Sequence, residues 1–467
     1  MTRVVIIGGG PGGYEAALVA SQLGGEVTLV ERQGLGGAAV LTDCVPSKTL
    51  IATAEAMATL RSADELGLSI GSEDVVEAIN VDLTKVNQRV LNLAAKQSAD
   101  IRSSLDGNGV EVVIGSGRLD GPDAVVVTSD QGEQRIDAEI TLIATGTRPR
   151  ELPDALPDGE RILTWKQLYA LTSLPEHLIV VGSGVTGAEF ASAYNALGAS
   201  VTLVSSRDMV LPGEDPDAAK VLQDVFVSRG VEIKSGSRAV AARREGDGVV
   251  VTLAGGEEIE GSHCLMAVGS LPNTEDLGLE EAGIAMDRGY ITVDKVSRTS
   301  RRGVYAAGDV TGVLPLASVA AMQGRIAMWH SLGDAVAPLN LASVSSNVFT
   351  APEIATVGVT QKDVDSGSSQ AVGVTVSLRG NARAKMQDNT EGFVKLFCLP
   401  LTGIIVGGVV VAPHASELIH AVSVAVAERI TVDTFSHDFT VYPSVSGSIA
   451  EAARRLHGHA AQRQITV

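Results

Sequence analysis

Short apolar runs alternate with longer mixed segments along this chain, and two stretches share one pattern. The apolar run 3–7, "RVVII", precedes a glycine-rich turn, a helical stretch at 14–24 and a second apolar run at 26–30. The same order of strand, turn, helix and strand returns at 177–204. β-Branched runs of this length favour strands, and strands that alternate with helices favour parallel sheets. The pattern therefore predicts an α/β chain that contains two similar βαβ units.

The first turn has the spacing G-x-G-x-x-G, formed by Gly8, Gly10 and Gly13. Gly8 allows the tight turn, Gly10 has no side chain to block a pyrophosphate, and Gly13 lets helix and strand pack closely. The N-terminus of the following helix favours anionic phosphates. Glu31 ends the second strand, where a carboxylate can accept hydrogen bonds from ribose hydroxyls. Together these residues predict a dinucleotide site.

The second turn repeats this spacing with Gly182, Gly184 and Gly187. Its second strand ends without a carboxylate, in a stretch that contains Ser205 and Arg207. A carboxylate there would repel a ribose 2′-phosphate, whereas a serine and an arginine tolerate or attract it. The site therefore favours NADPH, or accepts both NADPH and NADH. The alternative, that Arg207 is only a solvated loop residue, stays open.

Two dinucleotide sites in one chain suggest an electron relay. One dinucleotide would be a resident flavin and the other a visiting nicotinamide. A flavin suits the relay because it can accept a hydride on one face and release electrons on the other.

Charge and composition narrow the class of function. The 55 acidic residues outnumber 36 basic ones, giving a net charge of -19, which argues against binding to nucleic acid or to an anionic membrane. Three cysteines stand far apart and suggest neither a disulfide framework nor a metal site. The N-terminus does not resemble a signal peptide. The apolar run 403–412 is too short to span a bilayer and suits a buried strand. We expect a cytoplasmic protein without a membrane anchor.

Further motifs follow the first turn in a fixed order. They are the loop "GGAAVLTDCVPSK" at 36–48, "ATGTRP" at 144–149, the turn at 182–187, "VGSLPNT" at 268–274, "GVYAAGDV" at 303–310 and "VFTAPEIATVG" at 348–358. In this order the chain resembles the flavoprotein disulfide reductases, such as lipoamide dehydrogenase and glutathione reductase. The resemblance implies an α/β fold with two Rossmann-like dinucleotide-binding domains, for FAD and NAD(P), and a C-terminal α+β dimerisation domain.

The resemblance also implies domain boundaries and a quaternary structure. The FAD domain would comprise residues 1–149 and 272–340, the NAD(P)H domain 150–271, and the interface domain of a homodimer 341–467.

Several residues receive roles from the same resemblance. Lys48 would lie near flavin N5 and pair with Glu189. Asp309 would bind the ribityl chain of FAD. Gly146 belongs to the strand and turn where the chain leaves the FAD domain, and we include it among the residues that bind the cofactor.

The chain departs from the family pattern at the residues that reduce disulfides. Only Cys44 remains of the two loop cysteines, because the first position is Ala39, and the residue before Cys44 is Asp43 in place of the usual glycine. Near the C-terminus, Tyr442 stands at the catalytic histidine position and Gly447 at the position of its supporting acid. Disulfide reduction needs a second sulfur and a proton donor matched to neutral pH. We therefore reject lipoamide, glutathione and similar disulfides as substrates.

The remaining chemistry is hydride transfer from NAD(P)H to FAD and two-electron reduction of a soluble acceptor, for which a quinone fits best. The chain resembles the lipoamide dehydrogenase-like NAD(P)H quinone reductases, which lack the redox disulfide. Tyr442 could contact the acceptor or serve only in packing. Cys44 could have a lowered pKa beside a helix N-terminus and a lysine, or be a buried thiol without a catalytic part. Cys264 and Cys398 stand in apolar runs typical of a core.

Three other readings stay open. The chain could be a soluble transhydrogenase between NADPH and NAD, a single-cysteine peroxidase that depends on Cys44, or an FAD-binding structural or interaction protein.

Overall fold

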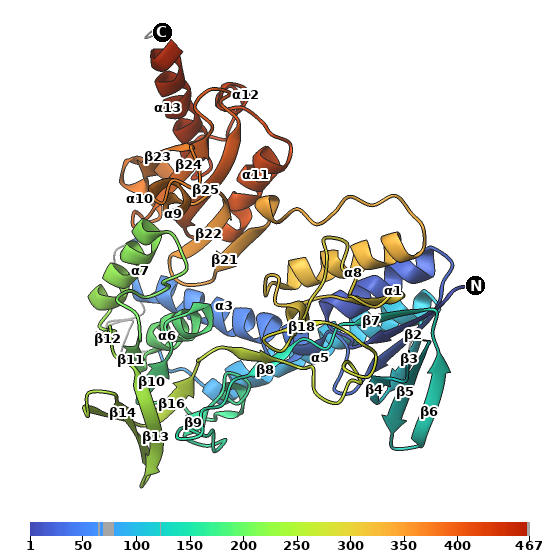
Figure 1. Cartoon of the computed structure of the whole chain (residues 1–467). Coiled ribbons are helices and arrows are strands. Elements are labelled where there is room, and N and C mark those ends of the chain that lie inside the picture. Colours follow the sequence, from blue (N-terminus) through green and yellow to red (C-terminus); the bar gives the residue numbers. More distant parts are fainter. Residues whose placement is uncertain (64–65, 69–78, 122, 465–467) are drawn as a thin grey trace.

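The computed structural model describes residues 1–63, 66–68, 79–121 and 123–464. Three five-stranded sheets organise the chain, two of them parallel and one antiparallel. In Figure 1 the first parallel sheet lies on the right in blue and cyan, the second at the lower left in green, and the antiparallel sheet at the top in orange and red.

The first sheet has the strand order β20-β7-β1-β2-β3, and all its neighbours are parallel. Its strands are β1 (Arg3–Ile7), β2 (Glu26–Glu31), β3 (Glu111–Ile114), β7 (Ile140–Ile143) and β20 (Val304–Ala306). β1 and β2 are buried along almost their whole length, as expected for parallel strands covered on both faces. Two helices, α1 (Pro11–Gln22) and α8 (Ala317–Ser331), pack against each other beside this sheet (Figure 1).

The second sheet has the order β12-β11-β10-β16-β9 and is also parallel. Its strands are β9 (Ile162–Leu163), β10 (His177–Val181), β11 (Ser200–Val204), β12 (Glu232–Lys234) and β16 (His263–Met266), and its helices are α6 (Val185–Leu197) and α7 (Pro216–Ser228). The chain enters this unit through β8 (Thr147–Pro149) and returns through β17 (Ser270–Pro272). These two strands pair antiparallel, so the two crossings lie side by side.

The third sheet, of order β21-β22-β25-β24-β23, is antiparallel. Its strands are β21 (Ser345–Val348), β22 (Glu353–Gly358), β23 (Val372–Ser377), β24 (Phe393–Cys398) and β25 (Ile405–Ala412). The helices α11 (Ala415–Ala427), α12 (Val432–Ser436) and α13 (Gly447–Gln464) accompany it. The apolar run 403–412 forms the buried strand β25, which confirms its assignment from the sequence.

Two helices join the first unit to the second. α3 (Cys44–Arg61) leaves the first unit and packs against α5 (Leu83–Gly107) and against α6 of the second unit. The smaller elements are the sheets β4 (Ser116–Leu119), β5 (Ala124–Ser129), β6 (Gly132–Asp137) and β13 (Ala239–Glu245), β14 (Gly248–Leu253), β15 (Glu258–Gly261), the hairpin β18 (Met286–Asp287), β19 (Tyr290–Ile291), and the helices α2 (Gly37–Leu41), α9 (Gln361–Asp365) and α10 (Ala382–Met386). The architecture agrees with the predicted class of two parallel α/β units followed by an α+β unit.

Candidate active site

The first glycine turn joins β1 to α1 and has the geometry that its spacing predicts. Gly8 has φ 108°, and a Cβ there would overlap the Ala144 carbonyl oxygen. A Cβ at Gly13 would overlap the carbonyl oxygen of Gly8. At Gly10, which precedes α1, a Cβ would meet nothing closer than Gly37 Cα at 4.0 Å. The turn therefore packs tightly where it faces the protein and is open at the helix N-terminus, where a pyrophosphate fits.

Glu31, at the end of β2, is buried beside this turn. Its carboxylate accepts hydrogen bonds from the backbone N–H groups of Gly9 at 2.6 Å, Gln33 at 2.6 Å and Gly34 at 3.2 Å. These bonds hold the turn against the loop after β2. A carboxylate has about four acceptor sites, so Glu31 keeps capacity for a ribose hydroxyl.

Asp309 and Gly146 come together where β7 and β20 end. Asp309 begins a 3₁₀ turn, Asp309–Thr311, and its carboxylate accepts a hydrogen bond of 3.3 Å from the Thr147 hydroxyl. Gly146 has φ 65° and open space around its Cα. Burial raises the pKa of Asp309, although the hydrogen bond from Thr147 opposes the shift. Residues from two distant segments thus meet at the carboxyl edge of the first sheet, where ligands of open α/β sheets bind.

Lys48 on α3 and Glu189 on α6 form an ion pair of 2.9 Å between Nζ and Oε2. The Glu189 side chain is 4% exposed and that of Lys48 29%. Burial alone lowers the pKa of Lys48, but the charge of Glu189 and its hydrogen bond reverse the effect and raise it. The lysine therefore keeps its positive charge in a partly dry site.

Phe349 completes this pair and was not singled out from the sequence. Its backbone N–H donates to Glu189 Oε1 at 2.9 Å, and its ring lies 4.9 Å from Lys48 Nζ, within the range of a cation–π interaction. The motif 348–358 marked only the start of the C-terminal unit. The contact joins residues 160 positions apart, so no local pattern could reveal it.

Cys44 begins α3, and burial raises its pKa to about 11. The charge of Asp43 adds to the shift, and Lys48 only partly offsets it. Of the two alternatives drawn from the sequence, a lowered pKa and a buried thiol, the raised pKa favours the second, because burial and a neighbouring carboxylate outweigh the helix N-terminus and the lysine. Cys264 in β16 and Cys398 in β24 are fully buried, which confirms them as core residues.

Asp43 and Tyr169 add polar groups near the same helix start. Burial raises the pKa of Asp43, although Lys48 and Lys166 oppose the shift. Tyr169 belongs to the 3₁₀ turn Leu168–Ala170, and its buried hydroxyl has no hydrogen-bond partner in the part of the chain that is described. The sequence showed Asp43 only as a departure from a glycine, and it gave no signal for Tyr169.

The second glycine turn repeats the geometry of the first. Gly182 has φ 114°, and a Cβ there would overlap the Ala267 carbonyl oxygen. A Cβ at Gly187 would overlap the carbonyl oxygen of Gly182, whereas Gly184 has no atom within 4 Å of such a Cβ. The turn at the start of α6 is therefore also open to a phosphate.

Ser205 lies fully buried at the end of β11. Its hydroxyl lies 2.7 Å from the Ser183 hydroxyl, accepts from the Arg207 N–H at 3.1 Å and donates to the Arg207 carbonyl at 2.9 Å. The sequence placed Ser205 among the residues that bind the nucleotide. In the structure its side chain turns into the protein, where it shapes the loop. Arg207 is exposed, so its side chain, unlike that of Ser205, can reach a ligand.

Comparison with known proteins agrees with this geometry. Residues 2–324 match the family described as pyridine nucleotide-disulphide oxidoreductase, and residues 344–453 match its dimerisation domain. The chain belongs to the pyridine nucleotide-disulphide oxidoreductase family. The predicted family, fold class and enzyme class of oxidoreductase are therefore confirmed.

Relatives of this family cover almost the whole chain. An NAD(P)H dehydrogenase (quinone) of Mycobacterium tuberculosis strain H37Rv is 54% identical over 470 residues, which cover 98% of this chain and 94% of the relative. A dihydrolipoyl dehydrogenase of Bacillus subtilis is 33% identical, with 97% of this chain and 96% of the relative covered.

Two solved structures share the fold. The crystal structure of LpdA from Mycobacterium tuberculosis has a TM-score of 0.93 at 54% identity, and the alignment covers 98% of this chain and 100% of that one. The flavoprotein disulfide reductase RclA from Escherichia coli has a TM-score of 0.85 at 24% identity, with 97% and 99% covered, which shows a common fold alone.

Tyr442 stands apart from the other predicted site residues of this family member. It precedes the cis peptide bond to Pro443 in the C-terminal unit, and 87% of its surface is exposed. It borders a surface cavity that is also lined by Asn381 and Arg383.

Within the described residues no helix is both long enough and apolar enough to cross a bilayer.

Proposed function

We propose that this chain is an FAD-dependent NAD(P)H:quinone oxidoreductase that works without a redox-active disulfide. The observation that carries the proposal is the ion pair of 2.9 Å between Lys48 and Glu189, beside a loop in which Ala39 stands at the position of the first thiol. The relative named NAD(P)H dehydrogenase (quinone), which is 54% identical, supports the same acceptor class. Disulfide reduction needs a second sulfur and a proton donor, and Ala39 and Tyr442 supply neither near neutral pH.

The residues at the first sheet fit FAD. The turn with Gly8, Gly10 and Gly13 would hold the pyrophosphate, Glu31 the ribose and Asp309 the ribityl chain. Gly146 leaves open space beside Asp309. Bound FAD would supply hydride acceptance and two-electron transfer. We assign FAD to residues 1–149 and 272–340, as the sequence predicts.

The nicotinamide dinucleotide would bind at the second turn, within residues 150–271. Gly182, Gly184 and Gly187 would let its pyrophosphate approach the start of α6. Arg207, which is exposed, would attract a 2′-phosphate, so we propose NADPH as the preferred donor and NADH as a second one.

Lys48 would act through its charge. An ammonium group near the flavin stabilises negative charge that develops on reduction, and a site of low polarity strengthens this effect. Glu189 holds Lys48 in place and keeps it protonated. In the complete reaction, NADPH, one proton and a quinone give NADP⁺ and a quinol, and no sulfur changes its oxidation state.

The test is steady-state oxidation of NADPH and NADH by the purified holoenzyme with four acceptors. The acceptors are a small naphthoquinone, lipoamide, a nicotinamide analogue and hydrogen peroxide. Fast turnover with the quinone and none with lipoamide is the expected result. Turnover with the nicotinamide analogue alone would make the enzyme a transhydrogenase, and a bound flavin that NAD(P)H does not bleach would leave an FAD-binding structural protein.

Cys44→Ser is the matched variant in this assay. Because the pKa of Cys44 is about 11, the thiolate that a peroxidase needs is scarce near neutral pH. We expect quinone reduction to stay within about twofold of the wild type, since the variant leaves Lys48 and Glu189 in place. Peroxide turnover that is lost in the variant would instead make Cys44 the reactive group.

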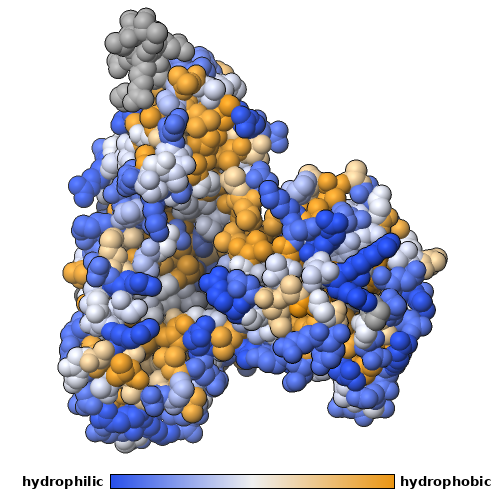
Figure 2. Space-filling model, viewed as in Figure 1, coloured by the Kyte–Doolittle hydropathy of each residue, from blue (hydrophilic) through white to orange (hydrophobic). Residues whose placement is uncertain are grey.

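We also propose a homodimer formed through residues 341–467. The match of 344–453 to a dimerisation domain supports this assembly. Figure 2 shows apolar side chains gathered on the flank of the C-terminal unit, over the region of α11 and α12. Phe439 and Val441 are 103% and 78% exposed in the single chain, as expected for side chains that a second subunit covers. The cytoplasmic location stays a prediction of the sequence.

A further inference from the structure

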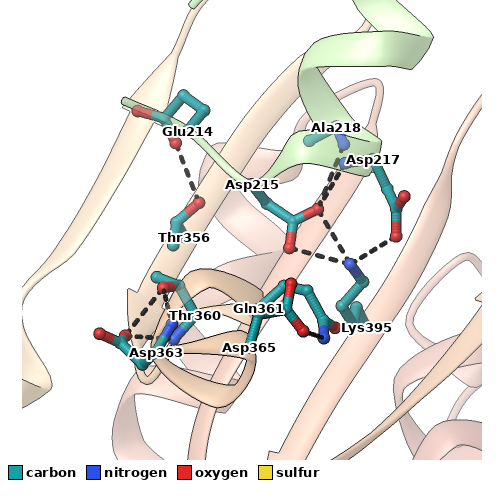
Figure 3. Close-up of polar contacts among 10 residues, drawn as sticks. All are labelled: Glu214, Asp215, Asp217, Ala218, Thr356, Thr360, Gln361, Asp363, Asp365 and Lys395. Atoms are coloured by element: carbon teal, nitrogen blue, oxygen red, sulfur yellow. Dashed lines mark hydrogen bonds and ion pairs between the residues drawn. The ribbon is translucent and has the colours of Figure 1, made fainter. Parts of the chain in front are cut away.

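A lysine lies buried between the second and third units. Lys395 on β24 is 2% exposed, and its Nζ lies 2.9 Å from both carboxylate oxygens of Asp215, whose side chain is 0% exposed (Figure 3). Asp217 adds an oxygen at 2.7 Å but is 66% exposed. Lys395, Asp215 and Asp217 together form the interdomain ion cluster.

If the only task of this cluster were to join the two units, burying its charges would cost more free energy than apolar packing does. Taking an ammonium and a carboxylate out of water costs several kcal/mol per ion by general estimates, and apolar residues of the same size often hold an interface equally well. What an ion pair adds is a fixed geometry, because both oxygens of one carboxylate must face one nitrogen. Such a fixed arrangement matters where a nearby site depends on it.

Asp215 links the interdomain ion cluster to α7 of the second unit. Its carboxylate also caps α7, accepting from the N–H groups of Asp217 at 3.0 Å and Ala218 at 3.3 Å. The residue before it, Glu214, accepts a hydrogen bond of 3.2 Å from the Thr356 hydroxyl on β22 (Figure 3). The third unit therefore holds two consecutive residues at the start of α7.

From Glu214 the contacts lead directly to the nicotinamide turn. The Glu214 N–H donates to the Leu211 carbonyl at 3.0 Å, and the Leu211 N–H donates to the Ser183 carbonyl at 2.8 Å. Ser183 stands between Gly182 and Gly184 in the second turn. Leu211 has φ 53°, a conformation that leucine adopts only when its surroundings impose it. The loop 205–214, which carries Arg207, is thus held at both ends.

We propose that Lys395 is a positioning residue for the nicotinamide dinucleotide. Through Asp215 it fixes the start of α7, and through Glu214 and Leu211 it fixes the loop 205–214 against the glycine turn. The third unit thereby sets the affinity of a site whose glycine turn lies in the second unit. This inference rests on the nicotinamide half of the proposed function and does not depend on the acceptor.

The test compares Lys395→Met with the wild type in the holoenzyme. Anaerobic stopped-flow reduction of the flavin by NADPH gives the Kd for NADPH and the limiting rate, without any quinone. We expect the Kd to rise about 2- to 30-fold, the range of couplings transmitted through packed networks, while the limiting rate changes less than twofold. Hydrogen exchange of the peptide that covers 205–214 should become faster in the variant, with or without NADPH.

Two further variants separate positioning from general destabilisation. Asp215→Asn keeps an acceptor for the helix cap but removes the charge, so it should raise the Kd by a similar factor, and the double variant should add little. If Lys395→Met does not fold, the Kd of Asp215→Asn tests the inference by itself. Val432→Ala truncates a fully buried side chain of α12, which lies at the end of the third unit away from α7 (Figure 1), and should leave the Kd unchanged.

An unchanged Kd and unchanged hydrogen exchange in Lys395→Met would overturn the inference, as would an equal rise of the Kd in Val432→Ala. If NADPH fails to reduce the wild-type flavin, the proposed function fails, and the exchange of 205–214 still tests the inference.

Discussion

Lys48 and Glu189 each have a second contact that fixes their place. The Phe349 N–H occupies the Glu189 oxygen that Lys48 does not use, and the Phe349 ring faces the ammonium. A carboxylate with both oxygens engaged and an ammonium against a ring have little freedom to turn. The charge that we propose to lie beside the flavin is therefore held in one position before any ligand binds, which is the condition for electrostatic catalysis.

Replacing Glu189 by glutamine tests this pair through stability. Glu189→Gln keeps the shape but removes the charge that faces Lys48, and we expect the free energy of unfolding to fall by about 1–3 kcal/mol near pH 7. Because the folded pKa of Lys48 is raised, this contribution is complete below its unfolded pKa of about 10.4 and is lost as the pH rises through the folded value. Urea unfolding of both proteins between neutral and strongly alkaline pH measures it.

The expected result is a difference in stability that is constant up to about pH 10 and narrows above it. Glu176→Gln, at an exposed acid of the same unit, is the control and should show no difference. A gap between Glu189→Gln and the wild type that does not change with pH would contradict the assigned role of the Lys48 charge.

Arg207 offers a test of nucleotide choice. Arg207→Glu places a negative charge where we propose that the 2′-phosphate binds, so the ratio of kcat/KM for NADPH to that for NADH should fall by about tenfold or more, equivalent to about 1.4 kcal/mol. Lys220→Glu changes the net charge equally from the exposed face of α7 and should leave the ratio unaltered. An equal loss for both nucleotides would mean that Arg207 does not read the phosphate.

At the scale of elements, the two glycine turns differ in what each glycine does. Gly184 has φ -73° and room for a Cβ, whereas Gly187 has no room, because the carbonyl of Gly182 occupies that space. One position is therefore reserved for a ligand and the other for the packing of helix on strand.

This difference gives a paired prediction. Gly184→Ala should leave the melting temperature within about 1 °C, because a free Cβ costs the fold little, but should raise the Kd for NADPH about tenfold. Gly187→Ala should lower the melting temperature by several degrees. Calorimetry and equilibrium titration with NADPH measure the two quantities, and a Gly184→Ala protein with normal affinity would exclude a pyrophosphate at this turn.

The same scale explains what could be predicted from the sequence. The glycine turns, the strands around them and Lys48 follow from patterns within about 30 residues or from family motifs, and the structure places them as expected. The contacts of Phe349 with Glu189 and of Lys395 with Asp215 join residues 160 and 180 positions apart, and no periodicity encodes them. The buried Ser205 hydroxyl lies against the Ser183 hydroxyl, and no pattern in the sequence shows which way that side chain points.

At the scale of the whole molecule, one segment of the third unit exposes several large side chains. Phe439, Val441 and Tyr442 form an exposed segment, with 103%, 78% and 87% of their surfaces accessible. Three large side chains in one exposed stretch indicate a missing partner more strongly than scattered ones do.

If the chain forms the proposed homodimer, Phe439→Asp should convert it into a monomer at micromolar concentration, because a carboxylate buried in an apolar interface costs several kcal/mol. Light scattering coupled to size exclusion measures the mass. Val227→Asp, at an exposed position on α7, is the control and should remain dimeric. A Phe439→Asp protein that stays dimeric would remove this segment from the proposed interface.

The pairing of β8 with β17 has a consequence for how such a molecule can be assembled. Pro149 lies opposite Ser270, so the whole of the second unit is inserted between two neighbouring positions of one short antiparallel ladder. An inserted unit whose two ends are adjacent can be replaced by another domain without moving the unit into which it is inserted. Lys48 and Lys395 lie outside the second unit and would remain after such a replacement. A replacement domain therefore fits only if it places carboxylates at the positions of Glu189 and Asp215.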